Sequence, residues 1–211
     1  MLKHYSITNE SNLAGFLMVL GGIIILITIL FEYRIGWIGV ERPESAIPPF
    51  IFNAWSQLRL IWGWQVIGFF FIAVAYLLLL KSSVSVIKSL FWAVLLLCTI
   101  SLIIAFGITL GSYYTALEVY DEQPVIFDAL RGVVRSLYSI GLLSLILLIV
   151  VHLHETFGRN RTIHREWGLA GFSIVVIGVV LSFVPGLPGQ LIGAVIFFIP
   201  VFIGFGYWRN T

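Results

Sequence analysis

Long apolar runs, each close to the length of a membrane-crossing helix, limit what this chain can fold into. A helix rises about 1.5 Å per residue, so about 20 apolar residues cross a hydrocarbon core roughly 30 Å thick. Six segments reach or approach that length: 13–31, 61–80, 90–110, 131–153, 168–184 and 190–207. We therefore predict an all-α integral membrane protein, built as a bundle of six transmembrane helices.

The composition supports a membrane protein without a water-soluble domain. Apolar residues make up 60% of the chain and charged residues 10%, whereas soluble domains carry roughly 25% charged residues. A soluble fold of 211 residues has too small an interior to bury that much apolar surface. No polar block is long enough for a second domain, so we predict that residues 1–211 form a single multi-pass domain in the cell (plasma) membrane.

The connections between the segments suggest how the bundle begins and ends. The segment 13–31 lacks the small-residue cleavage site of a signal peptide, so we expect it to be retained as a helix. The last two segments are separated by Pro-Gly-Leu-Pro-Gly at 185–189. Proline cannot continue a helix and glycine permits a tight reversal, which predicts a closing helical hairpin.

The distribution of basic residues predicts that both termini are cytoplasmic. Cytoplasmic connections of membrane proteins are enriched in lysine and arginine. With both ends inside, seven of the basic residues fall on the cytoplasmic side and five outside, the latter being Arg34, Arg42, Arg59, Arg131 and Arg135.

Two longer connections, 32–60 and 111–130, then lie on the outer side. The first is rich in aromatic and apolar residues, so we expect it to cap the bundle or lie along the membrane interface. The second contains Glu118, Asp121, Glu122 and Asp128. These acids lack the spacing of an EF-hand, which favours a solvated acidic loop over a calcium site.

Arginines at the outer helix ends are the best candidates for a binding site. Arg131 and Arg135 are four residues apart, hence on one helical face, with Tyr138 at its edge. Arg59 stands at the start of the second segment. If these residues converge, they form a cationic pocket that holds a carboxylate or a lipid phosphate in fork geometry.

A structural role for the same arginines is the alternative. They can pair with Glu32 and Asp128, or extend to water, and so hold the outer helix ends together.

Cofactor and catalytic motifs do not stand out in the sequence. Cys98 is the single cysteine, and three of the four histidines, His152, His154 and His164, lie in one stretch. His152 and His154 are two residues apart and point about 200° away from each other on a helix. We therefore expect no haem, metal or other cofactor, and instead a basic cytoplasmic rim that attracts anionic lipids. Phosphate-binding loops, nucleophile elbows and zinc-protease motifs are missing, which argues against an enzyme.

The order of segments, with Leu-Arg-Gly-Val-Val-Arg-Ser-Leu-Tyr at 130–138 and a glycine-rich closing pair, resembles a bacterial family of six-helix integral membrane proteins of unknown function. That family has no assigned reaction or ligand. The resemblance therefore implies a fold and nothing catalytic.

Three functions are compatible with the sequence. The favoured one is a non-enzymatic membrane protein that binds lipid or a partner membrane protein, as a subunit or regulator. A small-molecule or anion transporter is the alternative, suggested by the arginines and by Pro200, which should kink the last helix. A lipid-modifying enzyme using the outer acids is the third. The small, dispersed charge of +2 gives no reason to expect nucleic acid as a partner.

Overall fold

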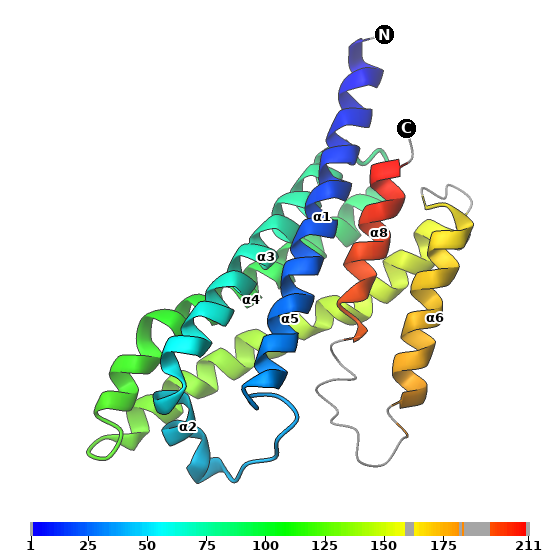
Figure 1. The fold of residues 1–211 in the computed structure, drawn as a ribbon. Coiled ribbons are helices and arrows are strands. Elements are labelled where there is room, and N and C mark those ends of the chain that lie inside the picture. Colours follow the sequence, from blue (N-terminus) through cyan, green and yellow to red (C-terminus); the bar gives the residue numbers. More distant parts are fainter. Residues whose placement is uncertain (1, 159–162, 182, 184–194, 210–211) are drawn as a thin grey trace.

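The computed structural model describes residues 2–158, 163–181, 183 and 195–209, and the regular secondary structure in this part of the chain is entirely helical. Four helices are long and apolar enough to cross a bilayer (Figure 1). They are α1 (Leu2–Arg34, apolar from Glu10 onward), α3 (Trp55–Ser82), α4 (Val86–Glu118) and α5 (Pro124–Phe157). The prediction of an all-α protein with membrane-crossing helices is confirmed at this level.

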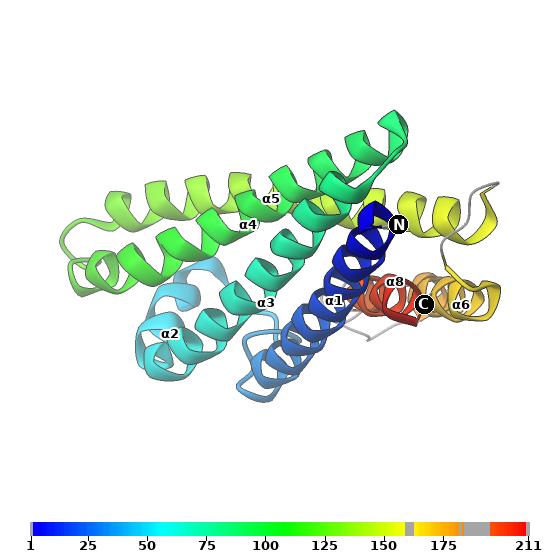
Figure 2. The same ribbon diagram turned by 90° about the horizontal axis from the view of Figure 1, so that it is seen from above.

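The long helices form a row in which neighbours in sequence are neighbours in space. Helix α1 packs on α3, α3 on α4, and α4 on α5, as the view along the row shows (Figure 2). The other side of α1 is covered by α8 (Phe198–Arg209), which packs in turn on α6 (Arg165–Leu181). The far end of α5 crosses to meet α6 and α8.

The last two predicted segments are represented by shorter helices. Helix α6 has 17 residues and α8 has 12, both shorter than the roughly 20 residues that typically cross a bilayer. The proline- and glycine-containing connection 185–189 lies outside the described residues. A turn at residues 196–197 interrupts the helical path just before Pro200, and α8 begins at Phe198, so Pro200 lies in the first turn of a helix, where a proline is tolerated.

The connections between α1 and α3 and between α4 and α5 are more ordered than the sequence suggested. Between α1 and α3, the chain forms a 3-10 turn (Glu44–Ala46) and the short helix α2 (Ile47–Asn53), which starts with prolines. Helix α4 continues to Glu118, and α5 begins at Pro124. The predicted acidic loop 111–130 is therefore wrong in extent, because only residues 119–123 connect the two helices.

Glycines bring α1 very close to its neighbours. A Cβ atom at Gly21 would lie 2.5 Å from the carbonyl oxygen of Gly68 in α3, and one at Gly15 would lie 2.6 Å from that of Gly204 in α8. Small residues allow this approach of helix backbones, which drives association in membranes through dispersion contacts. Helix α1 is consequently fixed between α3 and α8.

Candidate functional site

A groove of about 690 Å³ runs between α1 and α3 and opens to the outside of the bundle. Apolar side chains from both helices line most of it, namely Ile24, Ile27, Phe31, Leu60, Ile61 and Trp64. Three polar residues, Thr28, Arg34 and Gln57, also line it, and Arg34 and Gln57 lie near the ends of their helices that face the cap. The groove thus combines apolar walls with a cation and an amide at one end.

The register of the two antiparallel helices explains why these polar groups meet. Gly21 packs against Gly68, and Glu32 further along α1 reaches Trp62 near the start of α3. Because the helices are antiparallel and Arg34 follows Glu32 by two residues, Arg34 lies beside the first turns of α3. Arg34 also lies in the last turn of α1, where the helix dipole favours a positive charge.

A second, smaller pocket of about 420 Å³ lies on the adjacent face of α3. Arg59 and Ser56 line it together with Gly63 and Ile67. Leu60 and Trp64 belong to both pockets, so they form a ridge between them. Arg34 and Arg59 therefore lie on the two sides of one apolar ridge, at the same end of α3.

The predicted arginine cluster is divided between two parts of the structure. Arg131 and Arg135 lie on α5, where Arg131 Nη2 is 3.9 Å from Glu44 Oε1 and Arg135 is exposed. Tyr138 packs edge-on against Phe106 of α4, with ring centroids 6.2 Å apart.

Arg59 lies on α3, and α4 lies between α3 and α5 (Figure 2). The residues that line its pocket all come from α3. The structure therefore brings Arg59 near Arg34, which the sequence analysis did not select, rather than near Arg131, Arg135 and Tyr138.

Glu32 is a buried residue that sequence reasoning placed in an exposed connection. It belongs to α1 and is only 6% exposed. The indole Nε1 of Trp62 donates a hydrogen bond of 2.8 Å to Glu32 Oε1, and Gln65 is a second hydrogen-bond partner. Trp62 and Gln65 are three residues apart and therefore share a helical face. This spacing can be read from the sequence, but the sequence does not show that Glu32 is the residue that both of them contact.

An aromatic cap covers this carboxyl group. Trp37 and Trp55 each contact the buried ring of Trp62 edge-on, with ring centroids 5.7 Å and 6.2 Å apart. Trp37 also stacks on Phe50 of α2, and the guanidinium of Arg42 lies 3.8 Å from the centroid of the same Phe50 ring. The apolar connection 32–60 thus caps the bundle, as expected, and Trp62 lies buried beneath it.

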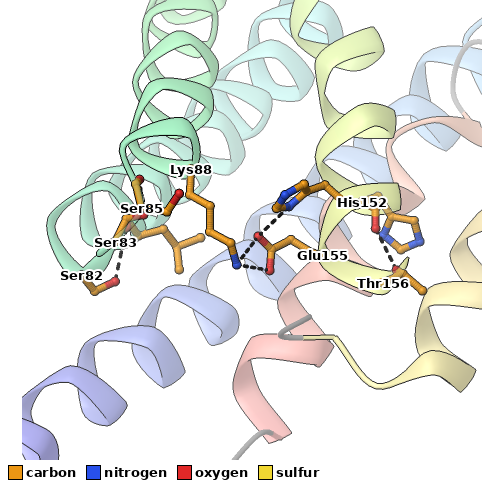
Figure 3. Close-up of polar contacts among 9 residues, drawn as sticks. Ser82, Ser83, Ser85, Lys88, His152, Glu155 and Thr156 are labelled. Carbon is orange, nitrogen blue, oxygen red and sulfur yellow. Dashed lines mark hydrogen bonds and ion pairs between the residues drawn. The ribbon is translucent and has the colours of Figure 1, made fainter. Parts of the chain in front are cut away.

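At the opposite end of the long helices, polar contacts join α4, α5 and α6. Lys88 Nζ lies 2.8 Å from Glu155 Oε1, and this carboxylate is 1% exposed (Figure 3). His152 Nε2 is 2.8 Å from the carbonyl oxygen of Gly168, and Thr156 donates to the carbonyl of His152.

The basic rim predicted at this end is only partly supported. That rim was expected to contain His152, His154, Arg159, Arg161, His164 and Arg165. His152 is buried and has a structural contact, His154, His164 and Arg165 are exposed, and Arg159 and Arg161 lie outside the described residues. Within the described ranges, no group of three or more His, Cys, Asp or Glu side chains could hold a metal ion.

Comparison with known proteins gives no match to a family model, a curated protein or a solved structure. The resemblance to a bacterial six-helix family therefore stays a prediction. The function has to be argued from the geometry of the grooves and of the buried polar groups.

Proposed function

We propose that this chain is a six-span protein of the plasma membrane that binds an anionic lipid at its outer face, without acting as an enzyme. The observation that carries the proposal is the pair of arginines on either side of the Leu60–Trp64 ridge. An acyl chain occupies the α1–α3 groove, and Arg34 and Arg59 bind the lipid phosphate.

The walls of the groove suit a hydrocarbon chain. Ile27, Phe31, Leu60 and Trp64 are all large apolar residues that remain more than 40% exposed in the isolated chain. In a bilayer these surfaces face lipid, and a chain seated in a concave groove makes more dispersion contacts than one on a convex helix.

The polar end suits a phosphate. Arginine presents planar, paired N–H donors that match phosphate oxygens, and its charge is favourable next to an anionic headgroup. The Gln57 amide adds a neutral donor beside Arg34. None of the salt bridges found in the described ranges includes Arg34 or Arg59, so both guanidinium groups are available to a ligand.

The proposed topology places these arginines in the outer leaflet. Helices α1, α3, α4 and α5 provide four spans. The segments containing α6 and α8 provide the fifth and sixth, and both termini are cytoplasmic. In this arrangement a bound lipid joins α1 to α3, as expected for a subunit or regulator whose assembly depends on lipid.

A transporter is the second candidate, and Glu32 is the observation that favours it. Ionisable residues inside a membrane bundle are costly and often mark the path of an ion or substrate. Glu32 stands at the start of the connection 32–60 in the sequence, so its burial and this support for transport were not predicted.

The test is native mass spectrometry of the full chain with phosphatidylglycerol or phosphatidylcholine. We expect phosphatidylglycerol to be retained preferentially, and an Arg34→Gln/Arg59→Gln variant to bind it about tenfold more weakly, equivalent to about 1.4 kcal/mol. Arg135→Gln removes an exposed arginine from α5 and is the matched control. Equal retention of both lipids, or a loss of binding only in Arg135→Gln, would contradict the proposal.

A further inference from the structure

The Glu32 carboxyl group is buried without a compensating positive charge. None of the ion pairs in the described part of the chain includes Glu32. The groups that act on it are neutral: Trp62 and Gln65 from α3, and the phenol of Tyr138 from α5. A carboxylate removed from water is strongly unfavourable unless a counter-charge or a proton neutralises it.

Basic residues near Glu32 in the sequence do not supply that charge. Arg34 lines the α1–α3 groove, of which Glu32 is not part. The guanidinium of Arg42 lies over Phe50 and its Nη1 donates to the carbonyl oxygen of Val40.

The side chain of Gln65 lacks a hydrogen-bond donor for its carbonyl oxygen. Gln65 is only 4% exposed, and its Oε1 has no hydrogen-bond partner among the described residues. A buried carbonyl oxygen without a donor is unfavourable, and nearly all such atoms in folded proteins are paired. The missing group at Gln65 is therefore a donor, directly beside a carboxyl group that lacks a neutralising charge.

A single proton on Glu32 satisfies both residues. An amide carries its oxygen and nitrogen on one carbon, so a glutamine that hydrogen-bonds a carboxyl group can also accept from that group's O–H. Trp62 donates to Oε1, which leaves Oε2 to carry the proton and donate it to Gln65 Oε1. No metal ion is needed to balance the charge.

We infer that Glu32 and Gln65 form a proton-binding site beneath the aromatic cap. The bound proton neutralises the carboxylate and completes the hydrogen bonding of Gln65. When the proton leaves to water, a bare negative charge remains next to Trp62 and Gln65 inside the bundle. Proton release is therefore coupled to loosening of the contact between α1 and α3 or to opening of the cap.

Infrared spectroscopy of the full chain in lipid nanodiscs tests this inference directly. At neutral pH we expect the C=O stretching band of a protonated carboxylic acid, with a shift in D2O. Glu32→Gln should abolish the band, whereas Glu44→Gln, which changes an exposed acid, should leave it unchanged. Absence of the band in the unmodified protein at neutral pH would overturn the inference.

A second variant keeps the test decisive if Glu32→Gln does not fold. Gln65→Leu removes the acceptor, so the same band should move to higher wavenumber, because a carboxyl group that donates no hydrogen bond has a stiffer C=O bond. A merely structural glutamine would leave the band in place. If sodium ions raise the melting temperature of the unmodified protein while no acid band is present, the site binds a metal cation and the proton assignment is wrong.

Discussion

The indole of Trp62 donates a hydrogen bond of 2.8 Å to the carboxyl group of Glu32, and this bond joins α3 to α1 beneath the aromatic cap. Trp62 also contacts Trp37 and Trp55. Trp62 thus connects the buried Glu32 carboxyl group to the aromatic cap.

Replacing Trp62 by phenylalanine tests how much this hydrogen bond stabilises the bundle. The substitution keeps an aromatic ring and removes the N–H, so a buried carboxyl oxygen loses its partner. We expect the free energy of unfolding to fall by about 1–3 kcal/mol, measured by thermal or denaturant unfolding in detergent. Trp64→Phe is the control, since Trp64 is exposed in the groove and should change stability little. Equal effects of the two substitutions would mean that the hydrogen bond contributes nothing specific.

Gly21→Ala should separate α1 from α3. Its new Cβ would meet the Gly68 carbonyl oxygen at 2.5 Å and a side-chain carbon of Ile72 at 2.8 Å. Overpacking of this kind costs about 1–3 kcal/mol, which should appear as a lower melting temperature. Gly107→Ala is the matched control, because a Cβ there has nothing within 4 Å. We expect it to be neutral or slightly stabilising; a comparable loss in Gly107→Ala would refute the packing argument.

Lys88 and Glu155 should be strongly coupled at the other end of the long helices. Glu155 is almost completely buried, so Lys88→Met leaves an unpaired buried charge and should cost about 3–5 kcal/mol. The double variant Lys88→Met/Glu155→Gln removes both charges and should recover much of that loss. A double-mutant cycle based on unfolding measurements gives the coupling energy. If the two single effects simply add, the pair is not an energetic unit.

The sequence predicted the membrane-crossing helices well because apolar length is a local property. Segments 90–110 and 131–153 lie entirely within α4 and α5. The ends of α4 and α5 nearest the cap were missed because they carry polar residues, such as Glu118, that are typical of loops. Helical packing there depends on contacts with the cap rather than on hydropathy.

The site was harder to predict because its residues come from different helices. A glutamate at the end of an apolar run looks the same whether it faces water or a tryptophan 30 residues away. The grouping of Arg59 with Arg131 and Arg135 relied on their common depth in the membrane. Depth alone does not say which helices are adjacent, and the structure places Arg34 and Arg59 on the two sides of the Leu60–Trp64 ridge.

We predict that both termini are cytoplasmic, and labelling of single cysteines can establish the direction in which the helices cross the membrane. Two exposed positions lie at opposite ends of the long helices: Val84, between α3 and α4, is 95% exposed, and Val125, at the start of α5, is 74% exposed. In a Cys98→Ala background, a membrane-impermeant thiol reagent added to intact cells should label Val125→Cys but not Val84→Cys. Inside-out vesicles should give the reverse pattern, and permeabilised membranes should label both. Labelling of Val84→Cys in intact cells would place Arg34 and Arg59 at the inner leaflet, so the anionic lipid would then have to be a cytoplasmic one.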